Sequence, residues 1–122
     1  MPTYTTPATK DNYQLILKVE RTAQNTAKTT STLKLTLYVQ PNGSHAFTAG
    51  VTGYVKDKKN KDTSWTTRKT FSHESKKVPY KTKTKIWEGT YTYNHASDKT
   101  LKVNFEIALK TTTQGKVWSM PN

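Results

Sequence analysis

Histidines are the first residues to consider for catalysis or metal binding, because their side chains titrate near neutral pH and ligate metals. The chain has 3, His45, His73 and His95, and none has a partner at the short spacing of a known zinc motif. A metal site or a His–Asp pair could start at His95 and Asp98. Asn94 and Asp98 are also typical turn residues, since their side chains bond to nearby backbone amides. We therefore expect a turn here and no metal site.

Carboxylates and serines give little support to an enzyme. Glycoside hydrolysis requires paired carboxylates, and most of the 8 acidic residues fall in lysine-rich segments. Glu88 and Glu106 are expected on outward strand faces, where they would pair with lysine. The chain has neither a G-x-S-x-G elbow nor a glycine-rich phosphate loop. It has no cysteine, which excludes thiol chemistry and disulfides. The sequence predicts no catalysis and no cofactor.

Basic residues are the strongest chemical signal. Lys and Arg number 20, for a formal net charge of +12. They are densest in segments 56–61 and 69–85, with aromatic residues in or beside the second segment. Lysine attracts phosphate, and aromatic rings stack on sugars or bases, so the combination suits an anionic polymer. The candidate ligand-binding residues are Lys58, Lys59, Lys61, Lys76, Lys77, Lys81, Lys83, Lys85, Trp65 and Tyr80.

Plainer interpretations of these residues stay open. Lysines commonly form a solvated surface that has no ligand. The core is the commoner place for tryptophan, so we expect Trp65 and Trp87 to be buried. The chain lacks an RNP-like aromatic strand, a GxxG loop and a recognition helix, which argues against nucleic acid as the partner.

Alternation of apolar and polar residues predicts the elements that position these side chains. It covers segments 13–22, 31–40, 46–57, 86–94 and 100–110, and a strand keeps such alternate residues on one face. In segment 86–94 it places Trp87 and Tyr93 on one face and Ile86 on the other. Segment 64–72 is expected to be a strand, 56–62 a charged hairpin loop and 116–122 an edge strand. Pro79 argues against a central strand within 73–85.

These segments predict an all-β domain, an antiparallel β-sandwich of about 6–7 strands that is immunoglobulin-like or jelly-roll-like, with a barrel as the alternative. The sandwich would span 13–119, between a flexible lead-in at 1–12 and a tail at 120–122. An edge strand around Tyr4 is the alternative for the lead-in. We expect neither a signal peptide nor a membrane partner. The predicted core is Leu15, Leu17, Val19, Leu33, Leu35, Leu37, Val39, Phe47, Val51, Leu101, Val103, Phe105, Ile107 and Leu109.

Two segments show a more specific pattern. Residues 87–109, WEGTYTYNHASDKTLKVNFEIAL, form a strand, a turn and a long alternating strand. Residues 13–39 form a strand, a polar link and a second strand. Both resemble elements of structural proteins from the tails of siphoviruses that infect Gram-positive bacteria. That family has a T-x-x-H-N-x-D-G-x-K-like turn; here Asn94 and His95 stand in reverse order, and Lys99 replaces the glycine.

The resemblance implies a β-sandwich module of a phage tail or baseplate, located in the virion. Other phage structural proteins, or further copies of the chain, would be its partners. Gram-positive walls carry teichoic acids, which are polyphosphates, so the lysine-rich loops are expected to meet this anionic polymer. We therefore expect a non-catalytic structural or adhesion module. One alternative is a carbohydrate-binding module of a larger wall-active protein, and another is a nucleic-acid-binding β domain. The first alternative would need a flat strip of exposed aromatics from Trp65, Trp87, Tyr91, Tyr93 or Trp118.

Overall fold

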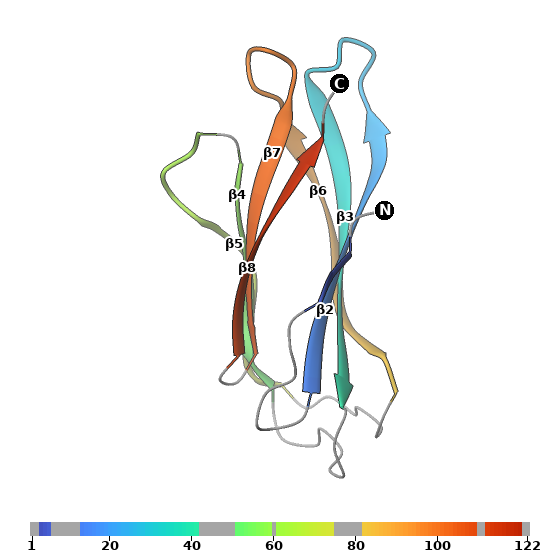
Figure 1. The fold of residues 1–122 in the computed structure, drawn as a ribbon, viewed down its shortest axis with the longest axis vertical. Helices are drawn as coiled ribbons and strands as arrows, with labels where there is room; N and C mark the ends of the chain where they lie inside the picture. Colours follow the sequence, from blue (N-terminus) through green and yellow to red (C-terminus); the bar gives the residue numbers. More distant parts are fainter. Residues whose placement is uncertain are drawn as a thin grey trace.

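Eight strands are found in the part of the chain that the structure describes (Figure 1). The computed structural model describes residues 3–5, 13–41, 51–59, 61–74, 82–109 and 112–120. The strands are β1 (Thr3–Thr5), β2 (Tyr13–Gln24), β3 (Thr30–Pro41), β4 (Val51–Lys59), β5 (Thr66–Glu74), β6 (Thr84–Asn94), β7 (Leu101–Leu109) and β8 (Thr112–Met120). Within these ranges there is no helix long and apolar enough to cross a bilayer.

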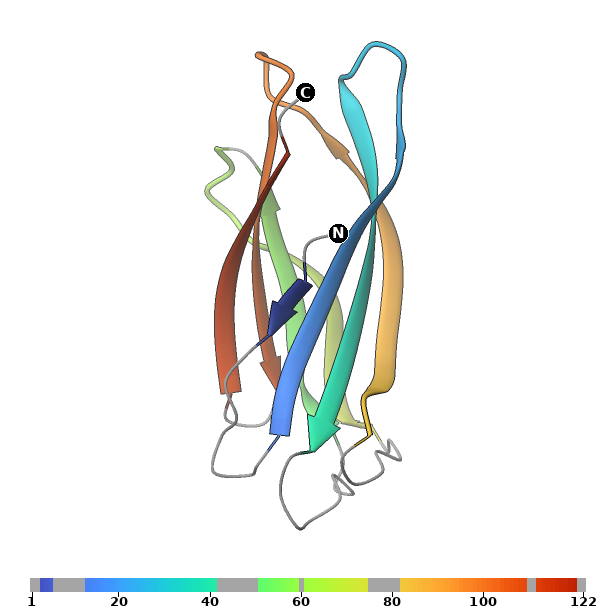
Figure 2. The same ribbon diagram turned by 45° about the vertical axis from the view of Figure 1, so that its right-hand side comes forward.

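The strands form two four-stranded antiparallel sheets (Figure 2). The first has the order β1-β2-β3-β6 and the second the order β5-β4-β7-β8. The chain changes sheet after β3, after β5 and after β6, so β6 returns beside β3 and β7 beside β4. Consecutive strands β3 and β4 thus lie in different sheets, and each pairs with one of the consecutive strands β6 and β7. Such crossed connections between two sheets are found in immunoglobulin-like sandwiches. The predicted all-β antiparallel sandwich is confirmed, and no pairing among the described strands joins the two sheets into a barrel.

Both ends of the chain contribute edge strands. Thr3–Thr5 pairs with β2 from Lys18 to Ile16, which is the edge strand around Tyr4 that the sequence left as an alternative. Strand β8 begins at Thr112, earlier than expected, because its whole length pairs with β7. Its threonine-rich beginning has no apolar alternation that could have indicated a strand. Residues 6–12 and 121–122 lie outside the described ranges.

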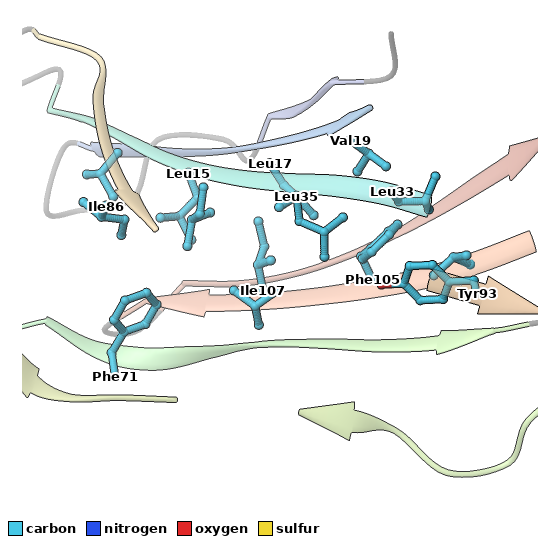
Figure 3. Close-up of a cluster of buried hydrophobic side chains, with 14 of the residues drawn as sticks. Leu15, Leu17, Val19, Leu33, Leu35, Phe71, Ile86, Tyr93, Phe105 and Ile107 are labelled. Atoms are coloured by element: carbon cyan, nitrogen blue, oxygen red, sulfur yellow. The ribbon is translucent and has the colours of Figure 1, made fainter. Parts of the chain in front are cut away.

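The core lies between the sheets and follows the alternating leucines of β2 and β3 (Figure 3). Its buried members are Leu15, Leu17, Val19, Leu33, Leu35, Leu37, Val39, Val55, Phe71, Ile86, Tyr93, Leu101, Val103, Phe105 and Ile107. The prediction is confirmed wherever side chains are described. Phe47 lies outside the described residues, and so do the side chains of Val51 and Leu109.

Two bulges turn side chains toward the interior, and one of these side chains, Ile86, had been misplaced by simple alternation. Between β3 and β6 the register shifts, so that Ile86 has no opposite residue. Ile86 is buried in the core, whereas alternation placed it on the outward face. Between β4 and β5 a similar shift leaves Arg68 as the extra residue. A bulge re-aims the side chain of its extra residue, and here Arg68 turns toward the interior, where it contacts Asp57.

Candidate functional site

The predicted ligand-binding residues do not form a single patch. Lys58, Lys59, Lys61 and Trp65 lie at the β4–β5 hairpin, at the end of the sandwich that also holds the β6–β7 turn. Lys83 precedes β6, and Lys85 is the second residue of that strand. Lys85 lies opposite Tyr38, near the end of β3, so these two lysines lie at the opposite end of the sandwich from the β4–β5 hairpin. Lys76, Lys77, Tyr80 and Lys81 lie outside the described residues.

Two cations lie over aromatic rings near the β4–β5 hairpin. The Lys58 Nζ is 4.7 Å from the centroid of the Trp65 ring, and the Lys56 Nζ is 4.3 Å from that of Tyr54. Trp65 is 39% exposed, the only large apolar side chain so exposed among those described. Its expected place in the core was therefore wrong. Trp65 precedes β5 and meets Lys58 on the outer face of the second sheet, which no further layer of described residues covers.

The register extends this surface onto β7. Lys58 lies opposite Asn104 and Lys56 opposite Glu106, and directly opposite residues point to the same side of a sheet. Lys102 shares that side with Asn104, two residues further along β7. We define the basic face as Tyr54, Lys56, Lys58, Trp65, Lys102 and Asn104. Glu106 is the only carboxylate among the described side chains of this outer face. It accepts a hydrogen bond from Tyr54 Oη at 2.7 Å.

The basic residues toward the opposite end lie on the first sheet, and two of them share one carboxylate. Glu88 Oε2 lies 3.5 Å from Lys34 Nζ and 3.4 Å from Lys85 Nζ. The charges of Lys34 and Lys85 lower the pKa of the Glu88 carboxyl. Lys83 lies over the Tyr38 ring, with its Nζ 4.5 Å from the centroid. One carboxylate thus accompanies three lysines here, as Glu106 does on the outer face of the second sheet, so what distinguishes the basic face is the exposed Trp65 ring beside Lys58.

A buried polar cluster joins the two sheets. Asp57 is 2% exposed, and its Oδ2 accepts hydrogen bonds from Arg68 Nε at 2.6 Å and Tyr93 Oη at 2.5 Å. The Arg68 guanidinium lies 4.4 Å from the centroid of the Tyr91 ring and 5.2 Å from that of Tyr93. Burial, then the hydrogen bond to Asp57, raise the pKa of Tyr93. Burial alone would lower the pKa of Arg68, but its bond to Asp57 raises it.

The cluster was missed because segment 56–62 was expected to be a loop. In the structure β4 continues to Lys59, since residues up to that point pair with β7. The available signal was alternation, because Gly53, Val55 and Asp57 share one parity and therefore one face. That parity places Asp57 inside. Because Asp57 is so little exposed, solutes cannot reach its carboxylate. Its hydrogen bonds to Arg68 and Tyr93 join the two sheets and serve a structural role.

A second polar contact involves a serine and a histidine. Ser31 Oγ lies 2.6 Å from His95 Nε2, and His95 Nδ1 lies 2.9 Å from the carbonyl oxygen of Lys99. A hydroxyl beside an oriented imidazole is the arrangement of an activated nucleophile. Ser31 is only 1% exposed, however, so a substrate cannot reach its oxygen in this conformation. The backbone N–H of His95 also donates to the carbonyl of Thr29, so the residue ties two turns together.

The turn predicted at His95–Lys99 is confirmed, and within it Asp98 bonds to Thr100. Asp98 Oδ1 accepts hydrogen bonds from the Thr100 backbone N–H at 3.1 Å and from its hydroxyl at 2.6 Å. Lys99 has φ of 69°, in the left-handed region that favours glycine. Within the described ranges, no three His, Cys, Asp or Glu side chains gather as metal ligands would.

The aromatic residues of β6 face the core and form no strip with Trp65. Trp87 and Tyr91 are partly buried against the core, and their rings stack with centroids 6.4 Å apart. Both rings lie over Gly89, where an added Cβ would come within 2.7 Å of Tyr91 Oη. Tyr93 is buried. The described side chains therefore do not form the flat strip that the carbohydrate-binding alternative requires, and the side chain of Trp118 is outside the described set.

Comparison with known proteins finds no match for this chain among protein-family models, curated proteins or solved structures.

Proposed function

We propose that this chain is a non-catalytic structural and adhesion module of a bacteriophage tail, and that its basic face binds the anionic polymers of the host cell wall. The observation that supports binding is the pair of cations, Lys58 and Lys56, held over Trp65 and Tyr54 on one exposed face. The face belongs to a sheet that is rigidly backed by the core.

Teichoic acid combines the two chemistries that this face can meet. Its phosphates attract lysines, and its sugar or polyol units offer apolar surface that an aromatic ring can cover. Lys56, Lys58 and Lys102 project from adjacent strands, and directly opposite or diagonal positions on one sheet face lie within about 5–8 Å of each other. Phosphates on a flexible polymer can reach several such positions together. The Asn104 amide adds a group that can donate to and accept from hydroxyls.

The tail assignment rests on the resemblance in β6, the β6–β7 turn and β7. It is supported by Lys99, which keeps the left-handed backbone conformation at the position where the family has glycine. The interlocked sandwich also suits a module that is held between neighbours in an assembly.

The test compares two double variants that remove the same charge. Lys56→Gln/Lys58→Gln should weaken binding to purified Gram-positive wall by about tenfold, because each exposed ion pair contributes roughly 0.2–1 kcal/mol. Lys83→Gln/Lys85→Gln, at the other end, should change binding less than threefold. Binding of the unaltered protein should weaken steeply as salt rises. Equal losses in the two variants would contradict a site on the basic face.

The alternatives appear as distinct outcomes of the same assay. Walls stripped of teichoic acid should lose most binding. If stripped walls bind as well as intact walls and Trp65→Ala abolishes binding, the protein is a carbohydrate-binding module. If duplex DNA binds as tightly as teichoic acid at about 0.15 M salt, the face is a general polyanion or nucleic-acid site. Either result would overturn the proposal.

A further inference from the structure

Strand β6 leaves one of its edges unpaired among the described residues. It is the last strand of the first sheet and pairs only with β3 (Figure 2). It is 11 residues long and keeps a regular register with β3 from Trp87 to Asn94. Such an edge presents a row of backbone donors and acceptors that can template another strand.

The other described edges are better protected. Strand β1 has 3 residues. Strand β5 is interrupted by two register shifts against β4, and its bulge carries Arg68. Strand β8 has Lys116 at its middle, whereas the lysine of β6, Lys85, stands near the beginning of that strand. By contrast, residues 89–94 of β6 contain no lysine, arginine or proline, which are residues that commonly block edge pairing.

We infer that β6 pairs with β6 of a second copy of this chain, antiparallel about a twofold axis at Tyr91. Directly opposite residues in an antiparallel pair share a face, so the two copies can align only in registers that keep inner residues against inner residues. The register centred on Tyr91 does so. It places Thr90 opposite Thr92 of the other copy, Tyr91 opposite Tyr91, and Glu88 opposite Asn94.

The side chains of this segment suit self-pairing. Thr90 and Thr92 are exposed, and Thr92 already makes such a cross-strand contact with Thr32, at 3.1 Å between the hydroxyl oxygens. Threonine and aromatic pairs stabilise neighbouring strands. The register brings no two like charges of β6 opposite each other. Residues 89–94 carry no charged side chain, which limits the repulsion between two copies of a chain of net charge +12. The neighbouring Lys34, opposite Thr90, is paired with Glu88. An isologous interface of this kind closes at two copies.

Dimerisation through β6 does not depend on the wall-binding proposal, and it should respond to salt in the opposite direction from wall binding. Sedimentation equilibrium should show a monomer–dimer equilibrium that shifts toward dimer when salt rises from about 0.05 to about 0.5 M, because screening reduces the repulsion between two basic chains. Wall binding should weaken over the same range. A protein that stays monomeric at every salt concentration, or forms open-ended oligomers, would overturn the inference.

Charges on the edge should prevent the dimer. In Thr90→Lys/Thr92→Lys, lysines would face each other across the twofold axis, and we expect the dimer dissociation constant to rise at least tenfold. Thr22→Lys/Thr26→Lys is the matched control, since both threonines are exposed and lie away from β6. Both variants add the same charge, so equal losses would show general repulsion and contradict an interface at β6.

Cross-linking tests the register itself. Because the chain has no cysteine, single substitutions report one contact. A mixture of Thr90→Cys and Thr92→Cys proteins should form disulfide-linked heterodimers under mild oxidation, because the two positions are opposite in the proposed register and opposite Cβ atoms approach within disulfide range. Either variant alone should cross-link several-fold less. Equal cross-linking in all three samples would rule out this register.

Discussion

At the scale of single residues, the contact between Asp57 and Tyr93 has the clearest energetic consequence. The phenol donates to a carboxylate from which water is excluded, and hydrogen bonds to charged groups contribute more than neutral ones. Removing one partner leaves the other buried without its bond. The effect of substitution should therefore be large for a single hydroxyl.

Tyr93→Phe should lower the free energy of unfolding by about 1.5–3 kcal/mol at neutral pH. The difference from the unaltered protein should shrink at alkaline pH. The pKa of Tyr93 is raised in the folded chain, so its stabilising contribution is complete below the unfolded tyrosine pKa of about 10 and is lost above it, by up to about 1.4 kcal/mol per pH unit. Urea unfolding between about pH 8 and pH 11 measures both effects.

Tyr38→Phe, on the outer face, is the control for the loss of one phenol. If the two variants show the same stability and the same alkaline slope, the buried bond to Asp57 does not contribute as proposed.

At the scale of elements, the β6–β7 turn combines a favourable and an unfavourable feature. The hydrogen bonds from Thr100, with a smaller effect of the Lys61 charge, lower the pKa of Asp98, which shows that the turn favours the ionised carboxylate. Lys99, next to it, is held at a positive φ. A non-glycine residue there has a conformational penalty of about 1–2 kcal/mol.

Lys99→Gly should raise the free energy of unfolding by up to about 1 kcal/mol, because relief of the strained backbone exceeds the extra entropy of glycine in the unfolded chain. Lys99→Ala removes the same charge but keeps the strain, so it should give no such gain. Chemical denaturation of both variants separates the two effects. A gain shared by Lys99→Ala would identify charge as the cause.

Alternation in the sequence predicted the main strands, but it carries no information on which strands pair. Leucine alternation in β2, β3 and β7 specifies which face is buried, since the period of two belongs to each strand by itself. The bulges at Ile86 and Arg68 depend on how two distant strands align, and no local pattern encodes that. Likewise the lysine-rich end of β4 is a strand because β7 pairs with it.

At the scale of the whole molecule, charge is unevenly compensated. Sequence proximity grouped the lysines into one candidate site, but the fold separates Lys58 from Lys85 by nearly the length of the sandwich and pairs only the latter with Glu88. Composition gave the excess of positive charge correctly. It could not indicate how the fold would divide the lysines between the two sheets, because each strand reverses direction.

The unfolding free energy should rise with sodium chloride by about 1 kcal/mol between about 0.02 and 0.5 M, since screening weakens self-repulsion in a compact chain of high net charge. Urea is the suitable denaturant because guanidinium is itself a salt. The basic-face variant Lys56→Gln/Lys58→Gln should show a smaller increase. A stability that falls with salt would mean that the ion pairs outweigh the repulsion.

The Asp57–Tyr93 contact also limits how the two sheets can slide past each other. Leucines spaced by two residues make each inner face repetitive, so a displacement of one pleat repeat, about 7 Å, would still bring apolar groups against apolar groups. Asp57 is the only buried carboxylate among the described residues. Only one alignment of the two sheets brings it to the Tyr93 phenol of β6 and completes its hydrogen bonds. If the sheets were displaced, the carboxylate would be buried without its hydrogen-bond donors. The contact thus fixes the relative position of two sheets whose apolar faces alone would allow several alignments.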